Sequence, residues 1–146
     1  MESQYKRNVA YKFKIGSILS GKPVMENERL KSLEIENKQV VRVNVIANIT
    51  DKYLQEGEKK FGSITLDDGS GQIKLKSFGD DSEKFRDLYQ GQTILVIGTL
   101  KNWNGETYIA PELVKEKDPK YLLLRKLETE KDRVKSSPNK DKEQIT

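Results

Sequence analysis

Between residues 39 and 115 the chain contains several stretches in which apolar and polar residues alternate. The longest is QVVRVNVIANIT (39–50), where every second residue from Val41 to Ile49 is apolar. Period-two alternation is typical of β-strands that bury one face. Shorter stretches of the same kind lie at 61–68, 72–78, 93–103 and 106–114. With 39–50 they give five predicted strands.

The segments between these stretches carry the signals of turns. Gly-Ser-Gly at 69–71 and Asn104-Gly105 predict tight hairpin turns, the second being a dipeptide strongly favoured in two-residue hairpins. A polar loop is expected at 51–60, and Pro111 should mark the edge or the end of the last strand. Neighbouring strands in this region should therefore be antiparallel.

Residues 79–91, GDDSEKFRDLYQG, predict a short helix between the third and fourth strands. The polar residues at 80–82 can cap its start, Phe85 and Leu88 give it an apolar face, and Gly91 suits its end. The order is then three strands, a helix and two strands (β-β-β-α-β-β). This order, with a long first strand, predicts an all-β fold, the five-stranded Greek-key barrel called the OB-fold.

Outside the barrel, two segments have patterns of their own. Val9, Tyr11, Phe13 and Ile15 alternate with polar or small residues and predict a short strand or extended arm, which Gly21, Pro23 and a run of charges to about residue 38 should end. Residues 118–135, DPKYLLLRKLETEKDRVK, predict a C-terminal helix. We therefore divide the chain into an N-terminal arm (1–37), the barrel (38–116), a C-terminal helix (117–136) and a disordered tail (137–146).

The amino-acid composition excludes several kinds of catalytic site but says little about the binding partner. The 146 residues carry a net charge of +4, a mild preference for an anionic partner. They contain no Cys and no His, which excludes thiol nucleophiles, Ser-His-Asp triads and the common zinc sites. We expect no catalytic residues, no metal, no cofactor and no small-molecule substrate, hence no enzyme. No signal peptide or membrane-spanning run is present, so we expect a cytoplasmic or nucleoid-associated protein, nuclear if eukaryotic.

A barrel of this kind binds oligonucleotides on its second and third strands and on the loops joining strands one to two and four to five. Single-strand binding requires cations for phosphates and flat aromatic rings for bases. Phe78, with Lys74 and Lys76, should point outward from the third strand, and Trp103 lies at the fourth hairpin. The other candidates lie on the first strand and on the two loops: Arg42, Tyr53, Phe61 and Lys101. Each also has a purely structural interpretation, such as closing the barrel end or solvating its surface.

The predicted C-terminal helix is more apolar than a solvent-exposed helix needs to be. Tyr121, Leu123, Leu124 and Leu127 occupy much of its circumference, more than one barrel could cover. Either the helix caps its own barrel, or these residues pack against helices of a partner subunit. We favour the partner.

Four stretches together resemble the middle subunit of replication protein A, especially its short archaeal-type versions. They are KRNVAYKFKIGSIL (6–19), FGSITLDDGSGQIKLKSFGDD (61–81), ILVIGTLKNWNGETYIAPE (94–112) and DPKYLLLRKLE (118–128), and the resemblance covers residues 6–128. It implies an OB-fold that binds single-stranded DNA by stacking bases on Phe78 and Trp103. It also implies a helix that packs with helices of two other subunits, and a role in replication, repair and recombination.

Two family features are not found in this sequence: the C-terminal winged-helix domain of many relatives and the Ser/Gly-rich N-terminal tail of the eukaryotic ones. Two other interpretations remain open. The barrel could bind RNA or tRNA, because stacking does not distinguish the two sugars. It could also act mainly as a structural subunit that barely contacts nucleic acid.

Overall fold

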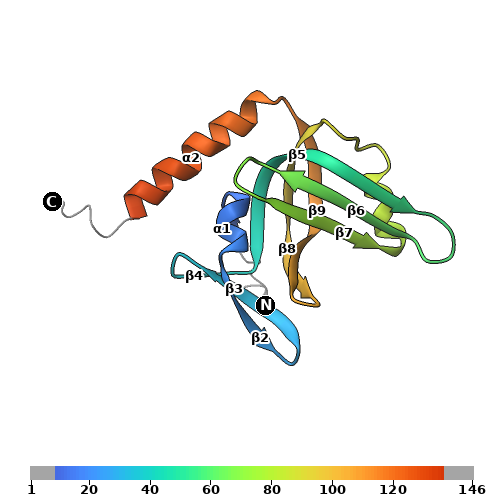
Figure 1. Cartoon of the computed structure of the whole chain (residues 1–146), viewed down its shortest axis with the longest axis horizontal. Helices are drawn as coiled ribbons and strands as arrows, with labels where there is room; N and C mark the ends of the chain where they lie inside the picture. Colours follow the sequence, from blue (N-terminus) through green and yellow to red (C-terminus); the bar gives the residue numbers. More distant parts are fainter. Residues whose placement is uncertain (1–8, 137–146) are drawn as a thin grey trace, which may run out of the picture.

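The computed structural model describes residues 9–136, with side chains placed through residue 131. Its elements, in chain order, are β1 (Ala10–Lys12), α1 (Ile15–Leu19), β2 (Lys22–Glu26), β3 (Arg29–Ile35), β4 (Lys38–Val40), β5 (Arg42–Gln55), β6 (Phe61–Asp67), β7 (Gln72–Phe78), the 3-10 helix η2 (Gly79–Phe85), β8 (Thr93–Trp103), β9 (Glu106–Lys117) and α2 (Lys120–Ser136). Figure 1 shows strands β5 to β9 wrapped around one another, with α2 extending from one side.

The long strand β5 closes the barrel by pairing with two partners in succession. Its first half, from Arg42 to Asn48, pairs with β8, and its second half, from Asn48 to Gln55, pairs with β6. The ring then runs β5-β6-β7-β9-β8 and back to β5. Alternate residues of these strands fill its interior, among them Val43, Val45, Ile64, Leu75 and Ile109. The predicted barrel is confirmed.

A bulge bends β8 and β9 where glycine faces proline. The register between the two strands shifts at Ile97/Gly98, and Gly98 pairs with Pro111. A Cβ on Gly98 would lie only 2.5 Å from the carbonyl oxygen of Ala110, so the strands can approach this closely only with glycine there. Pro111 does not end its strand, because β9 continues to Lys117, but it lies beyond the single β7–β9 pair at Ile109, where β9 is paired with β8 alone, so the expected edge position is confirmed. The bulge accommodates a residue that cannot donate to the ladder.

The expectation that regular structure stops between residues 21 and 38 is also wrong. β2, β3 and β4 form a separate three-stranded antiparallel sheet. Its turns are centred on Asn27-Glu28 and Glu36-Asn37, and all four of these residues have positive φ, as type I′ hairpin turns require. Leu33, Ile35 and Val40 are buried and join the barrel core, so the core is continuous across residue 37.

Two boundaries inside the barrel differ from the sequence prediction. β5 continues through half of the expected polar loop and ends at Gln55, because its polar residues pair with β6. The expected helix at 79–91 is a 3-10 helix that ends at Phe85 and has no side-chain cap at its start. Its predicted apolar face is confirmed, since Phe85 and Leu88 are buried. Phe85 packs directly over Gly62.

The N-terminal segment is part of the same folded unit. β1 pairs in parallel with the start of β5, on the edge that β6 leaves uncovered. Phe13, Ile15 and Ile18 then enter the core, whereas Val9 is exposed. The carboxylate of Asp68, in the β6–β7 turn, accepts a hydrogen bond of 2.9 Å from the amide of Ile15. The short strand expected here is confirmed, and α1 is an addition to it.

The C-terminal helix is present as predicted, beginning at Lys120. Its first turn is tied to Asp118, whose carboxylate accepts a bond from the amide of Lys120. It lies against β5 through Arg125, which is buried, and Lys12 of β1 forms an ion pair of 2.8 Å with Glu128. Within residues 9–136, no helix is long and apolar enough to cross a membrane. The predicted tail at 137–146 lies outside the described residues.

Candidate nucleic-acid interface

Three aromatic rings lie together on the outer face of β5, β6 and β7. Phe61 and Phe78 are directly opposite each other in the β6–β7 ladder, with ring centroids 5.1 Å apart. The ring centroid of Tyr53 on β5 lies 6.2 Å from that of Phe61. Phe78 is 61% exposed and Tyr53 is 54% exposed, although rings of this size are usually buried. We call these three residues the aromatic triad.

Trp103 lies at the tip of the β8–β9 hairpin. The turn residues Asn104 and Gly105 both have positive φ, which confirms the predicted tight turn. Trp103 is 65% exposed, so its ring does not fold back over its own hairpin into the core. A flat ring held at the end of a rigid hairpin is suited to stacking on a base.

Lys76 connects the triad to this hairpin. It lies on the same face of β7 as Phe78 and two residues away, about 7 Å along the strand. Its ammonium is 5.0 Å from the ring centre of Tyr108 and 5.9 Å from that of Trp103, close enough for cation–π attraction. It also forms an ion pair of 3.4 Å with Glu106. Triad, lysine and hairpin therefore form one continuous surface.

Two further lysines among the candidates are exposed at the border of this surface. Lys74 lies two residues before Lys76 on the outer face of β7, and Lys101 lies two residues before Trp103 on β8. Neither forms an ion pair with a described residue. Exposed, unpaired ammonium groups beside aromatic rings are placed to contact phosphates.

The structure does not bring Arg42 into this group. Its guanidinium binds the carboxylate of Glu112 at 2.8 Å, and Glu112 also accepts a bond from Thr99. Arg42 is opposite Thr99, four residues along β8 from Trp103, or about 13 Å. This distance along the strand places Arg42 apart from the rings and from Lys76.

Sequence reasoning missed Tyr108, the residue beneath Lys76. Tyr108 is half-buried, and burial raises the pKa of its phenol above the usual 10.0, so the ring is neutral at physiological pH. It faces Lys101 across the β8–β9 ladder. The period of two could have identified it: Ile109 faces the core, so its neighbour Tyr108 in β9 must face outward. Tyr89 is another exposed ring, at 58%, but its neighbour is Lys52, which lies over it, and it does not belong to the aromatic surface.

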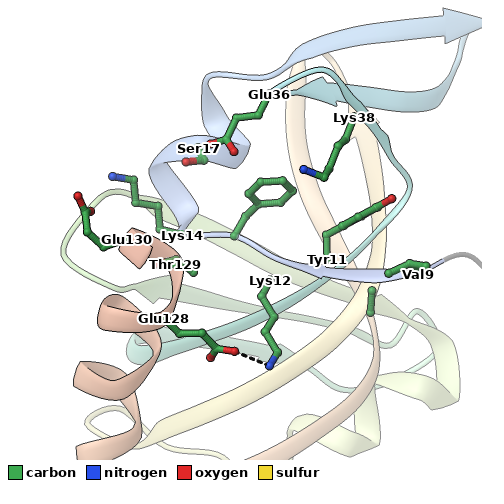
Figure 2. Close-up of a pocket in the computed structure, with 12 residues that line it drawn as sticks. Val9, Tyr11, Lys12, Lys14, Ser17, Glu36, Lys38, Glu128, Thr129 and Glu130 are labelled. Carbon is green, nitrogen blue, oxygen red and sulfur yellow. Dashed lines mark hydrogen bonds and ion pairs between the residues drawn. The ribbon is translucent and has the colours of Figure 1, made fainter. Parts of the chain in front are cut away.

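A hollow of about 350 Å³ lies between β1, the β3–β4 turn and α2 (Figure 2). Phe13 and Tyr11 are among the residues that line it. Three lysines and three glutamates line it, and one pair, Lys12 and Glu128, is joined by an ion pair. Balanced charges of this kind do not select for a polyanion. No group of three or more Asp or Glu side chains within the described residues is arranged to hold a metal ion.

The predicted partner-binding residues are exposed on α2. Leu123 and Leu127 are each 60% exposed, and Leu124 is 51% exposed. They lie at the spacing of one helix face, which we call the leucine face. Tyr121 is the most covered of the four, and the ammonium groups of Lys117 and Lys120 lie 5.1 and 5.5 Å from its ring centre.

A comparison with models of protein families finds one match, the OB-fold nucleic acid binding domain, over residues 41–116. This is slightly more than half of the chain, and it contains the triad, Lys76 and the Trp103 hairpin. The chain belongs to this family of OB-fold nucleic acid binding domains. Its sheet is the family's barrel, with the β2–β4 sheet and α2 added outside the matched residues.

Solved structures similar to this OB-fold chain cover most of its length. One is a chain of a Replication Protein A heterotrimer bound to ssDNA, with a TM-score of 0.71 and 16% identity, covering 89% of this chain and 99% of that one. Another is from the S. pombe Stn1–Ten1 complex, with a TM-score of 0.72, 14% identity, and coverage of 86% and 92%. A third is a chain of yeast RPA bound to ssDNA, with a TM-score of 0.64 and 22% identity, covering 86% of this chain and 90% of that one.

At these identities the likeness is one of fold. A search of curated protein sequences gave no significant match.

Proposed function

We propose that this OB-fold chain binds single-stranded DNA without sequence preference, as a subunit of a replication protein A-like complex. The observation that carries the proposal is the exposed aromatic surface formed by the triad, Lys76 and Trp103. Two rings that are more than 60% exposed lie at the two places where this fold contacts oligonucleotides. Each stacked base should contribute roughly 1–3 kcal/mol.

Phosphates provide the second part of the binding energy. Lys74 and Lys101 border the rings and have no carboxylate partner among the described residues. Backbone tracking by such lysines is independent of sequence and weakens as salt rises. The chain therefore holds exposed single strands without reading their bases, and it does no bond chemistry.

The leucine face supports a role within an assembly. Three leucines that are at least half exposed form an apolar strip on a helix fixed to the barrel. Two of the similar solved structures are from assemblies of different proteins, a heterotrimer and a Stn1–Ten1 complex. We propose that partner helices cover the leucine face, and that the complex acts where replication, repair and recombination expose single strands.

Fluorescence anisotropy with labelled oligonucleotides tests the proposal. The oligo-dT should be longer than the roughly 4–16 nucleotides that one such barrel occupies, with a duplex and an equal-length oligo-U as competitors. We expect binding to the single strand, no binding to the duplex, and weakening with salt. Phe78→Ala and Trp103→Ala should each reduce the affinity, whereas Tyr89→Ala, which removes an exposed ring outside the surface, should not.

Two results would contradict this function. A folded chain that binds neither DNA would leave only the assembly role. Tighter binding of oligo-U than of oligo-dT would favour an RNA-binding module, since stacking alone does not read the 2′-hydroxyl and would not produce that preference.

A further inference from the structure

Lys76 differs from the other lysines of the nucleic-acid surface because its charge already has a partner. Its side chain is 14% exposed and its ammonium is 3.4 Å from a carboxylate oxygen of Glu106. The ring centres of Tyr108 and Trp103 lie 5.0 and 5.9 Å from the same ammonium. Lys74, on the same face of the same strand, is exposed and has no such partner among the described residues.

Glu106 lies beside the ring of Trp103, on which a base would stack. It is directly opposite Trp103, at the first position of β9 after the hairpin turn. Its side chain is 52% exposed, so it reaches Lys76 from the solvent side and can leave without disturbing the core. A base stacked on Trp103 would bring its phosphate close to this carboxylate, and the two negative charges would repel each other.

We propose that Glu106 is an internal competitor for nucleic-acid phosphate. In the free protein its carboxylate neutralises Lys76 and holds it against the rings. When a single strand binds, a phosphate replaces Glu106 at Lys76 while the base stacks on Trp103. The inference rests on the proposed binding function and assigns to Glu106 the regulation of that site. Its effect is to weaken binding at one lysine, so that the strand can leave.

The exchange has a signature in the salt dependence of binding. A lysine that contacts a phosphate releases a counterion from the nucleic acid, which adds about 0.7 to the slope of log K against log salt for a single strand. Glu106, once displaced, takes up a cation from solution. The two ion movements cancel, so Lys76 adds nothing to the slope of the wild-type protein. A lysine without a carboxylate, such as Lys74, adds its full share.

The test measures affinity for oligo-dT over a range of salt concentrations. Glu106→Gln removes the competing charge with little change of shape, and we expect about two- to fivefold tighter binding at low salt. Its slope should steepen by about 0.7. The matched control is Glu116→Gln, which makes the same charge change on the same strand, ten residues and about 30 Å away. This control should leave the slope unchanged, because charges that distant are screened.

Variants of Lys76 and Lys74 test the exchange from the side of the lysines. Lys76→Gln should weaken binding but keep the wild-type slope, whereas Lys74→Gln should reduce the slope by about 0.7. In the Glu106→Gln background, Lys76→Gln should abolish the added steepness. A merely structural role for the ion pair would change affinity without this pattern of slopes.

The competitor role is wrong if Glu106→Gln and Glu116→Gln behave alike while the wild-type chain binds oligo-dT. It is also wrong if the double variant keeps the steeper slope. Absence of binding by the folded wild-type chain would overturn both the competitor role and the binding function, and that result is visible before any variant is made.

Discussion

Arg125 of α2 is joined to Asn44 of β5 by two hydrogen bonds that span 81 residues of sequence. The guanidinium donates to the main-chain oxygen of Asn44 at 2.7 Å and to its side-chain oxygen at 2.8 Å. Arg125 is only 7% exposed, and this burial lowers the pKa of its guanidinium, which remains charged. The contact fixes which side of α2 faces the barrel, and so it leaves the leucine face in solvent.

Arg125→Ala should therefore destabilise the chain. It removes two hydrogen bonds to a charged donor and leaves a main-chain oxygen without its partner, a loss of roughly 1.5–3 kcal/mol. Urea unfolding monitored by circular dichroism measures it. The affinity for oligo-dT should be unchanged, because Asn44 lies outside the aromatic surface. Unchanged stability in this variant would show that α2 does not depend on the contact.

The same helix shows what the sequence could and could not predict. Its existence and approximate bounds followed from its composition, and its exposed leucines were recognised as more than one barrel could cover. The residue that anchors it could not be found, because sequence rules place apolar residues on the inward side of a helix. Here an arginine is inside and leucines are outside, and only the position of the Asn44 oxygens explains this.

Exposed leucines should make the isolated chain associate with itself. Apolar strips of this kind are rarely left in water, so helices of two copies should pair when no partner is present. Sedimentation at rising concentration should show larger species for the wild-type chain and a monomer for Leu123→Glu with Leu127→Glu. Leu113→Glu, which changes an exposed leucine of β9, is the matched control and should behave like the wild type. A monomeric wild-type chain at all concentrations would contradict this.

Gly98 should tolerate no side chain. Even a methyl group would meet the Ala110 carbonyl oxygen at 2.5 Å and Ile109 at 2.6 Å. We expect Gly98→Ala to destabilise the barrel by roughly 1–3 kcal/mol and Gly98→Val by more. Thermal unfolding of the two variants should give this order. Equal melting temperatures for wild type and Gly98→Ala would mean that the strands can separate at the bulge without cost.

The ion pair between Lys12 and Glu128 should make stability depend on pH. The hydrogen bond from Lys12 lowers the pKa of Glu128 below its usual 4.5, and Arg125 adds to this shift from 3.5 Å. A lowered carboxyl pKa stabilises the fold above the unfolded value, and this is lost as the pH falls through the folded pKa. Because both partners are almost half exposed, the contribution should be below about 1 kcal/mol.

Urea unfolding of Glu128→Gln at about pH 7 and about pH 3 tests this shift. The variant should be less stable than the wild type at the higher pH, and the difference should vanish at the lower one. Glu130→Gln, on the same helix and with no ion pair to a described residue, should show no such dependence. If Glu128→Gln remained less stable than the wild type at the lower pH, the lost stability would not come from the charge of Glu128.

The barrel strands could be predicted because each alternates strongly, and because Gly or Asn closely follows β6, β7 and β8. β2 and β3 could not, because their turns use Asn27-Glu28 and Glu36-Asn37, where no glycine announces the positive φ. For the binding surface, outward orientation was predictable for Phe78 and Lys74 from the period of two. The neutralised state of Lys76 and Arg42 was not, because their carboxylates come from β9, 30 and 70 residues away.

The most direct measurement uses Trp103 itself, the chain's only tryptophan, which therefore reports on its own surroundings. Unlabelled oligo-dT should be added to the wild-type chain while tryptophan emission and the anisotropy of a trace of labelled strand are followed together. If bases stack on Trp103, emission should be quenched in step with binding, and Phe78→Ala should shift both curves to higher DNA concentration equally. Binding by anisotropy with unchanged emission would contradict a stacking surface at Trp103.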